Sequence, residues 1–490
     1  MAITKHREGR GSLGLWLLLA FALLLRVWKL TDKNIGLDES TSWYLANGSV
    51  SHLISWTADD VHPPLYYLLL KVWLWIFGDS LVALRSLSVV SSLIALYLFF
   101  RLIERALPTA VCYAAMLWCT LSPLSIYQAQ ETRMYAPATA VVLGACLAYR
   151  RWIESGATRR SALVLYAIAV TAALYLHYYT AFAVVAIWLH FLIVGARTAA
   201  PDSTFAACRA WIVAHVAVVI AYTPWVAFAW AQVARGQKFG PVTIDEIPDY
   251  ASLLIRGLTF GDHPMPGLLS WQGVVAVGVL AAGGVCLLVT IARTRDERDV
   301  FYACVAYLPG ILALSVLPLS GALELWWYVP YCSPLLVAAA ALGLSHTPLP
   351  SRVVAGALCA GALALLPSVV TYYSTSEKDS DMRPIVAYLL AHARHGADAQ
   401  SDPVYLLPIY IEYKLSYYSR DAIAYQWVAN DDLESLARDP ASEGKTVWLV
   451  VDMHSSSPTI AEVSQDASLR PVDVPGSNPK RVRLFQLAAH

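Results

Sequence analysis

Long apolar segments constrain the fold of this 490-residue chain more than any other feature. A helix that crosses a bilayer needs about 20 apolar residues and must satisfy its own backbone hydrogen bonds, because lipid offers none. Only 14% of the residues are charged, whereas soluble domains carry about 25%. We therefore predict a polytopic α-helical membrane protein with about 11 spans. The segments that qualify are 12–30, 81–101, 107–125, 135–150, 162–176, 180–196, 209–230, 269–292, 300–319, 328–345 and 352–370.

The first apolar segment follows a basic stretch from Lys5 to Arg10, so it is similar to a secretory signal peptide. Signal peptides end in small residues at a cleavage site, whereas here Arg26-Val27-Trp28-Lys29 follows the apolar run. We expect this segment to be an uncleaved first span.

The stretch from Pro64 to Phe77 determines the orientation of every later segment. It is apolar, but it is short, follows a second proline and carries Lys71. If it does not cross the membrane, the positively charged loops sort to the cytoplasmic side, as such loops usually do. These loops hold Lys5, Arg7 and Arg10; Arg101 and Arg105; Arg150, Arg151, Arg159 and Arg160; Arg197 and Arg209; Arg293, Arg295 and Arg298; and Arg352.

We therefore expect 64–77 to be a juxtamembrane or re-entrant helix. The N-terminus is then cytoplasmic, and the C-terminal part of the chain lies outside a cell membrane of the bacterial inner-membrane type. Several segments are near the lower length limit for a span. A count of ten to thirteen is compatible with these lengths.

The tail beyond residue 370 differs in pattern from the apolar part. Alternating and periodic apolar residues predict a helix at 382–393, strands at 404–409, 446–452 and 481–487, and a helix near 459–465. The chain should therefore consist of a membrane domain, 1–370, and a small extracytoplasmic α/β domain, 371–490.

Charge and cysteine usage exclude several classes of protein. The net charge is zero, so no basic surface for nucleic acid is indicated. All eight cysteines lie in or beside apolar segments, so neither a disulfide framework nor a zinc site is indicated. No cofactor signature is evident, and a requirement for a divalent metal stays open.

An acidic pair, Asp38 and Glu39, follows the first apolar segment. Carboxylates at a membrane boundary lose solvation unless water, a cation or a substrate compensates them, so they are candidates for function. The alternative is a solvated loop pair or a helix start, since a helical pattern runs on to Leu53. The helix start and the functional role are compatible, because a carboxylate fixed there is a positioned base.

Two further polar groups fall on the predicted outer side. His62, before two prolines, could donate to a phosphate or a sugar, or could be an ordinary loop histidine. Arg133 lies where positive charge is otherwise scarce and suits the bidentate recognition of a phosphate, although an ion pair with Glu131 or Asp38 would also explain it. Arg85 gives a weaker signal of the same kind. His177-Tyr178-Tyr179 is interpreted as part of an aromatic belt.

Carboxylates, a histidine and cations at one water–lipid boundary suit sugar transfer from a lipid phosphate. An acceptor hydroxyl needs a carboxylate base. The departing phosphate is already a good leaving group, with a second pKa near 6, and needs cationic stabilisation. A glycoside hydrolase would instead need two carboxylates about 5–10 Å apart, which adjacent residues cannot be assumed to supply.

Four motifs carry a specific resemblance: Leu37-Asp38-Glu39, His62-Pro63-Pro64-Leu65-Tyr66-Tyr67, Phe77-Gly78-Asp79-Ser80 followed by Arg85, and Glu131-Thr132-Arg133-Met134-Tyr135. With these motifs the chain resembles the GT-C superfamily of polyprenyl-phosphate-sugar glycosyltransferases, in the branch of protein O-mannosyltransferases and lipid A aminoarabinose transferases.

The resemblance implies an inverting transferase with its active site on the periplasmic or lumenal face and a polyprenyl-phosphate sugar as donor. It assigns the catalytic carboxylate to Asp38, with Glu39 in support. It assigns substrate binding to His62, Arg85, Glu131, Arg133 and Tyr135. The acceptor, whether lipid, glycan or protein, does not carry over.

The chain departs from many bacterial relatives of this superfamily at one motif. They carry an Arg-Tyr pair before the span that begins here near Trp326, where this chain has Glu324-Leu325-Trp326-Trp327-Tyr328. One phosphate contact could be missing, or could come from Arg235 or Lys238.

Two rival functions make different predictions. A secondary transporter or lipid flippase should show inverted repeats and broken helices with charges at the midplane, whereas this sequence has no evident repeat and its charges gather at one face. A scaffold or sensor with an extracytoplasmic tail explains the tail but leaves the grouping of Asp38, His62 and Arg133 without a role.

Overall fold

The computed structural model describes residues 8–195, 204–235, 243–261, 265–320, 325–375, 378–394, 401–408, 411–428, 445–453 and 468–487. The chain divides into two compact units, each of which is described by itself. The first, called the membrane unit, comprises Met1–Trp28, Val50–Gly78 and Arg85–Ser374. The second, called the sheet unit, comprises Lys29–Ser49, Asp79–Leu84 and Thr375–His490. The division expected at residue 370 stays a prediction.

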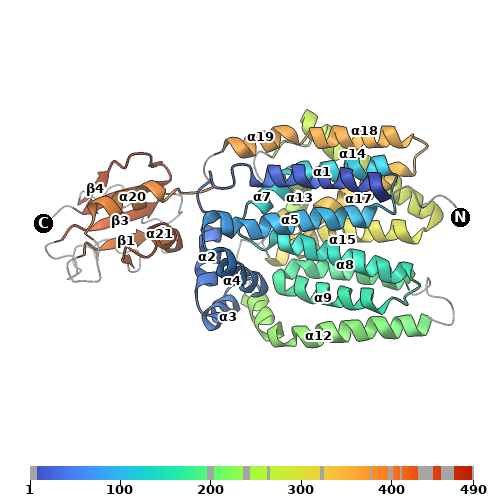
Figure 1. The fold of residues 1–490 in the computed structure, drawn as a ribbon, viewed down its shortest axis with the longest axis horizontal. Helices are drawn as coiled ribbons and strands as arrows, with labels where there is room; N and C mark the ends of the chain where they lie inside the picture. Colours follow the sequence, from blue (N-terminus) through green and yellow to red (C-terminus); the bar gives the residue numbers. More distant parts are fainter. Residues whose placement is uncertain are drawn as a thin grey trace. The chain divides into compact units, whose positions relative to one another are not determined.

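Helices make up the membrane unit, and the longer ones run side by side (Figure 1). Each of the eleven predicted apolar segments contains a helix. The helices are α1 (Glu8–Val27), α3 (Val50–Asp59), α4 (Leu65–Phe77), α5 (Leu81–Ile103, which begins in the sheet unit), α6 (Thr109–Leu121), α7 (Pro123–Ala129), α8 (Tyr135–Glu154), α9 (Arg160–Leu176), the 3₁₀ turn η1 (Tyr178–Thr180), α10 (Ala181–His190), the π-helical turn η2 (Phe191–Gly195), α12 (Thr204–Arg235), the 3₁₀ turn η4 (Ile244–Glu246), α13 (Ile247–Phe260), α14 (Trp271–Thr294), α15 (Glu297–Ser320), α16 (Leu325–Tyr328), α17 (Cys332–Ser345), α18 (Ser351–Leu363) and α19 (Leu366–Ser374).

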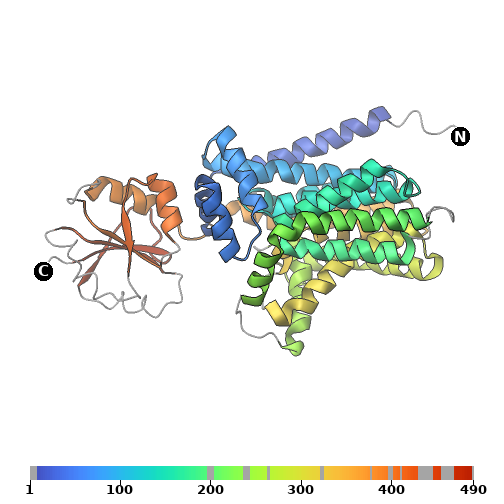
Figure 2. The same cartoon turned by 90° about the horizontal axis from the view of Figure 1, so that it is seen from below.

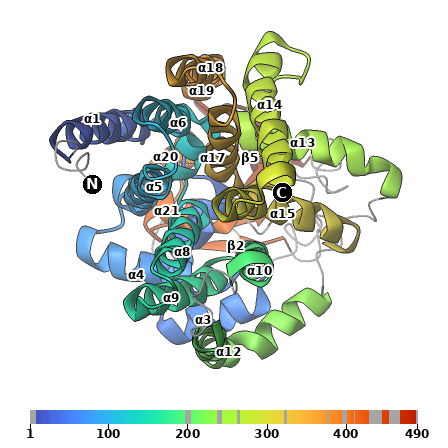
Figure 3. The ribbon, with the colours of Figure 1, turned by 90° about the vertical axis from the view of Figure 1, so that its right-hand side faces the viewer.

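Small residues let helices pack closely at the centre of this bundle, which Figure 3 shows end-on. α17 packs against α14, α15 and α6. The Cα of Gly343 on α17 lies so close to Gly283 of α14 that an added Cβ would approach its carbonyl oxygen to within 1.9 Å. Only glycine permits such a close approach of two backbones.

Large apolar side chains cover the outside of the same bundle. Trp16, Val219 and Leu288 are each more than half exposed, and α12 in particular buries little of its apolar surface. A surface of this size and polarity would aggregate in water, whereas lipid solvates it. The chain is therefore an integral membrane protein of polytopic helical architecture, as the sequence predicted.

Helix length bears on how many segments cross. Within the described residues, five helices are long and apolar enough to span: Leu81–Ile103, Thr204–Gln232, Trp271–Thr294, Glu297–Val316 and Ser351–Ser374. A sixth is added if α6 and α7, bent by 55° at Pro123, form one span. Shorter apolar helices, among them Leu13–Val27, Arg160–Leu176 and Cys332–Ser345, complete the bundle. The expected number of eleven crossings stays a prediction.

A mixed sheet forms the core of the sheet unit. Its strands are β1 (Val404–Leu407), β2 (Tyr425–Trp427), β3 (Trp448–Asp452), β4 (Leu469–Val472) and β5 (Val482–Leu487), in the order β2-β1-β3-β5-β4. β1 pairs in parallel with β2 and β3, whereas β5 pairs antiparallel with β3 and β4. The unit also contains α2 (Leu37–Asn47), α20 (Arg383–His392) and α21 (Glu412–Ser419).

Alternation along β1 explains the layers. Val404 and Leu406 join one apolar cluster with Leu389 of α20 and Leu415 of α21, while Tyr405 and Leu407 join a cluster on the opposite face. Successive strand residues point to opposite faces, so a strand buried on both sides must be continuously apolar. Figure 2 shows α20 and α21 over one face of the sheet.

The structure contains the helix expected at 382–393 and the strands expected at 404–409, 446–452 and 481–487, with slightly different bounds. The helix expected near 459–465 lies outside the described residues. α21, β2 and β4 were not predicted, because β2 is three residues long and β4 carries Arg470 and Pro471 at the edge of the sheet. The helix expected to run from Asp38 through Leu53 is interrupted at Gly48.

Candidate functional site

Arg133 is the centre of a polar cluster in the membrane unit. Its side chain is only 5% exposed. One terminal nitrogen, Nη1, donates to the Tyr67 hydroxyl at 3.4 Å, and the other, Nη2, lies 3.3 Å from His62 Nε2. His62 Nδ1 in turn lies 3.0 Å from Asp60 Oδ2. We call Asp60, His62, Tyr67 and Arg133 the Arg133 cluster.

The two ring nitrogens of His62 contact different partners, so the ring is held in one orientation. Nδ1 is directed at the Asp60 carboxylate, and Nε2 is directed at the Arg133 guanidinium. Burial raises the pKa of Asp60, but the hydrogen bond and charge of His62, with a smaller effect of Arg133, outweigh it and leave the pKa below its ordinary value.

Local sequence explains how three segments meet here. Pro64 precedes the first turn of α4, which places Tyr67 in that turn and His62 in the bend before it. Arg133 lies in the turn between α7 and α8, and Ser88 of α5 donates to its carbonyl oxygen at 3.4 Å. The structure therefore brings His62 and Arg133 together, as the sequence predicted for one site.

His177 lies at the turn between α9 and η1 and forms an aromatic wall beside the cluster. It is 4% exposed, its ring centroid is 6.4 Å from that of His62, and it stacks on Tyr328 at 5.6 Å. Tyr135, also buried, is 6.1 Å from His177. Burial, and then the positive charges of His62 and Arg133, lower the pKa of His177 to about 3. The ring therefore stays neutral.

Arg85 and Glu131 are both buried, with 1% and 6% of their surface exposed. Arg85 is three residues before Ser88 in α5 and so lies on the same helix face as the serine that binds the Arg133 backbone. Opposite charges at this depth suit a site that binds an ionic group, because buried charges need compensation.

Two members of the site were not singled out from the sequence. The only sequence indication for Asp60 is its position two residues before His62, and the same pattern fits a solvated acid in a loop. His177 was interpreted as part of an aromatic belt, but here it packs against Tyr135 and Tyr328 in the interior. Its burial depends on helices distant in sequence.

The two acids of the pair, which belong to the sheet unit, have different surroundings. Glu39 is fully buried, and its Oε2 accepts from the Gly36 backbone N–H at 2.9 Å and from Lys378 Nζ at 3.0 Å. The first bond is half of a capping box at the start of α2. Asp38, in the first turn, has an exposed side chain. Glu39 is thus held in the structure, whereas the side chain of Asp38 reaches the surface.

A large apolar groove lies in the membrane unit between α9 and α12, which are adjacent in Figures 1 and 3. Its volume is about 1520 Å³. Small and apolar side chains of the two helices provide most of the lining, and Pro64, Leu65 and Leu68 extend it along α4. Arg160 and Arg209 are the arginines that line it.

Among the residues that the structure describes, no group of three or more His, Cys, Asp or Glu residues could hold a metal ion. Lys238 lies outside the described residues, and for Arg235 only the backbone helix is described.

Comparison with known proteins places this arrangement in context. The sequence model of the dolichyl-phosphate-mannose-protein mannosyltransferase family matches residues 61–228, a range that includes His62, Arg85, Glu131, Arg133 and Tyr135. No curated protein sequence matches the chain.

Three solved structures are similar in fold. ArnT from Cupriavidus metallidurans in the apo state has 12% identity and a TM-score of 0.59, over 98% of this chain and 100% of that chain. The same protein bound to undecaprenyl phosphate has 14% identity and a TM-score of 0.59, over 97% and 99%. The apo oligosaccharyltransferase of Archaeoglobus fulgidus has 12% identity and a TM-score of 0.55, over 92% and 70%.

Proposed function

We propose that this chain is a glycosyltransferase of the polyprenyl-phosphate-sugar-dependent GT-C type, in line with the family model that matches residues 61–228 and with the similar folds. It transfers a sugar, with inversion, from a polyprenyl-phosphate donor to a lipid, glycan or protein acceptor on the extracytoplasmic face. One observation carries the proposal: a buried arginine, Arg133, is oriented by His62 and Asp60, and Pro64, two residues after His62, lines a large apolar groove.

The cluster is suited to the lipid phosphate. Arg133 presents a guanidinium fork next to the hydroxyl of Tyr67 and the ring of His62. A phosphate has the geometry for bidentate binding to that fork. The attraction between the phosphate and the guanidinium is stronger in a site with little water. Arg85, Glu131 and Tyr135 complete the substrate-binding set. The solved ArnT structure that holds undecaprenyl phosphate supports this class of donor.

The groove between α9 and α12 is suited to the isoprenoid chain. Its lining is apolar over both helices, and Pro64 and Leu65 place one part of it directly after the His62 motif. An isoprenoid gains little from leaving lipid for such a groove, so the groove orients the donor, and the ionic contacts of the phosphate provide specificity.

Asp38 takes the chemical role. Its carboxylate removes the proton of the acceptor hydroxyl, whose oxygen forms a bond to the anomeric carbon as the bond from that carbon to the phosphate oxygen breaks. The pair of electrons leaves with the polyprenyl phosphate, which Arg133 stabilises. A single displacement of this kind inverts the anomeric configuration.

The proposed topology has eleven spans, a cytoplasmic N-terminus and an extracytoplasmic sheet unit. The length of α4 supports it, because 13 residues rise only about 20 Å, less than the roughly 30 Å of the hydrocarbon core. Cysteine labelling from each side of the membrane, in a cysteine-depleted protein, should reach position 155 only from the cytoplasm. Labelling of that position from outside would reverse the orientation.

The decisive experiment uses the purified full-length protein in lipid nanodiscs. It is incubated with a panel of polyprenyl-phosphate sugars and with lipid, glycan and peptide acceptors, and mass spectrometry follows both the acceptor and the released polyprenyl phosphate. Transfer from at least one donor is expected. Movement of intact donor across vesicle membranes, without cleavage of the sugar–phosphate bond, would favour the flippase alternative instead.

A further inference from the structure

A short segment of the sheet unit holds the start of α2 on both sides of Asp38. We call this segment, Lys378–Ser380, the strap. Asp379 Oδ2 accepts from the backbone N–H of Leu37 at 2.8 Å, and Lys378 Nζ lies 3.0 Å from Glu39 Oε2. The residues immediately before and after Asp38 are therefore both bound by consecutive residues of the strap.

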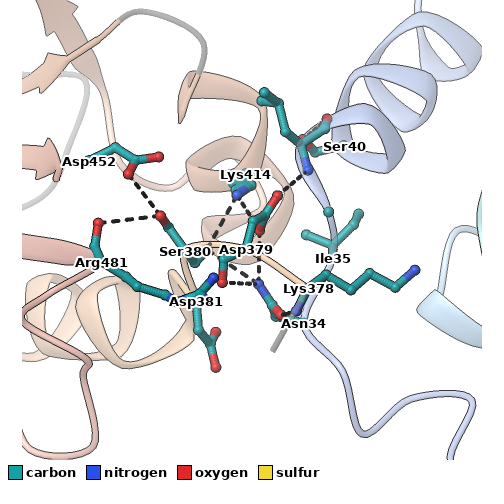
Figure 4. Close-up of polar contacts among 12 residues, drawn as sticks. Asn34, Ile35, Ser40, Lys378, Asp379, Ser380, Asp381, Lys414, Asp452 and Arg481 are labelled. Atoms are coloured by element: carbon teal, nitrogen blue, oxygen red, sulfur yellow. Dashed lines mark hydrogen bonds and ion pairs between the residues drawn. The ribbon is translucent and has the colours of Figure 1, made fainter. Parts of the chain in front are cut away.

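The strap and the segment before α2 are also joined through Asn34. The Asn34 side chain donates to Asp379 Oδ1 at 3.2 Å and to the Ser380 carbonyl oxygen at 3.3 Å, and it accepts from the Lys378 backbone N–H at 2.9 Å. Figure 4 shows Asp379 between Asn34 and Lys414. This set of bonds connects residues more than 300 positions apart in sequence.

The strap is in turn anchored to the sheet. Ser380 Oγ donates to Asp452 Oδ1, at the end of β3, at 2.9 Å and to the Arg481 carbonyl oxygen at 3.3 Å. Lys414 of α21, only 1% exposed, reaches Asp379 Oδ1 at 2.6 Å. A continuous path of hydrogen bonds thus runs from β3 through the strap to the first turn of α2.

Elementary electrostatics explains why this arrangement is rigid. The first N–H groups of a helix have no partner within the helix, and an anion there is favoured by the helix dipole. Asp379 provides that anion, and Lys414 neutralises it. Glu39 and Lys378 are buried together, and the loss of either leaves an uncompensated charge in the interior. Asp38 is the accessible carboxylate between two fixed neighbours.

We infer that the strap is a positioning device for Asp38, in which Lys378 and Asp379 are positioning residues that set the orientation of its carboxylate. The inference rests on the proposed function, in which Asp38 is the base. It adds that the sheet, through Ser380 and Asp452, controls the turnover number of the enzyme. Donor binding at the Arg133 cluster should be unaffected. A misplacement of about 1 Å at a catalytic group can lower the rate by about 10²-fold.

The test is a set of four proteins assayed for sugar transfer: wild type, Asp38→Asn, Lys378→Met and the double variant. Lys378→Met is expected to lower kcat by about 10²-fold and to change the donor KM by less than about twofold. In the Asp38→Asn background the same change should produce almost no additional loss, because the positioned group is already absent. Lys378→Arg, which retains the ion pair, should recover most of kcat.

Arg394→Met is the matched control, since it breaks an ion pair of the same unit, Arg394 with Asp402 at 2.9 Å, without any contact to the strap. It should leave kcat unchanged. Circular dichroism and size-exclusion profiles verify folding. If Lys378→Met does not fold, Asp379→Asn replaces it, because it keeps an oxygen for the Leu37 N–H but removes the charge.

The outcomes separate the two proposals. Wild-type kcat in a folded Lys378→Met or Asp379→Asn protein overturns the positioning role. The role is also overturned if the fold-decrease in kcat of the double variant equals the product of the fold-decreases of the two single variants. Absence of transfer by the wild type overturns the proposed function instead. Full activity of Asp38→Asn alone overturns the role of Asp38 as the base, and neither result depends on the strap.

Discussion

The Arg133 cluster and the strap both surround charged side chains in buried settings, but they compensate those charges differently. At the strap, oppositely charged groups meet at short range, with Lys414 at 2.6 Å from Asp379 and Lys378 at 3.0 Å from Glu39. In the Arg133 cluster, the arginine reaches His62 and Tyr67 at 3.3 and 3.4 Å, and neither of these two residues is a carboxylate.

The difference separates structural charges from charges suited to a ligand. Two lysines and two acids at the strap neutralise each other, so an incoming anion would have to displace an ion pair. The bonds from Arg133 to His62 and Tyr67 are longer than these ion pairs, whereas a charge-assisted bond to a phosphate is shorter and stronger, so a phosphate can replace them at a gain. The comparison predicts that substitutions at the strap affect folding and positioning, and substitutions at the cluster affect donor use.

The largest effect is expected at the accessible acid. Asp38→Asn keeps the shape and hydrogen bonding of the side chain but cannot take a proton, so turnover should fall about 10²–10⁴-fold. A carboxylate that served only the helix start would cost about 1 kcal/mol of stability and little rate. Single-turnover transfer and donor binding in the folded variant distinguish these cases. Near-normal turnover would move the assignment to Glu39, and then to Glu131.

Arg133→Ala comes next. It should lower kcat/KM for the donor by about 2–3 kcal/mol, the scale of a lost charge-assisted hydrogen bond. Arg133→Lys keeps the charge but loses the fork, so weaker use of the donor is expected even there. Steady-state kinetics with varied donor measure both. Wild-type donor kinetics in Arg133→Ala would leave the phosphate role without support.

Glu39→Gln tests the strap side of the comparison by its effect on stability. The amide still accepts from Gly36 but no longer neutralises Lys378. The free energy of unfolding is expected to fall by about 1–3 kcal/mol, because the buried charge of Lys378 loses its partner. Chemical unfolding followed in detergent measures it. Lys378→Met should be non-additive with this change. Full additivity in the double variant would mean that the two residues are not coupled.

The smallest effect concerns pH at the cluster. The pKa of His177 is lowered to about 3 in the folded protein, whereas an unfolded histidine titrates near 6.5. Below about pH 6.5 the unfolded chain therefore binds a proton that the folded chain does not. The stability due to His177 is present above that pH and is lost as pH falls, by about 1–2 kcal/mol at pH 5.

Melting temperatures at pH 7.5 and pH 5 test this effect. His177→Gln, which cannot titrate, should lose less stability on acidification than the wild type. An equal loss in the two proteins would show that His177 is already protonated, or exposed, in the folded state.

The sequence by itself determined the helical part of this protein. Each expected apolar segment is helical, because lipid leaves backbone groups no other partner, and that requirement can be predicted from hydropathy alone. The sequence also indicated that Arg133 is exceptional, since its charge breaks the pattern of the surrounding loops. The capping box of Glu39 has a local pattern too, with the glycine and the acid three residues apart.

Only the tertiary structure decided the partners of these residues. Glu39 pairs with Lys378, and His62 lies between Asp60 and Arg133, with His177 beside them. Local patterns report contacts within about four residues along a helix or two along a strand, whereas the pairs Glu39–Lys378 and His62–Arg133 join segments separated by whole helices. Packing therefore buried one acid of an adjacent pair in an ion pair and left the other exposed at the surface.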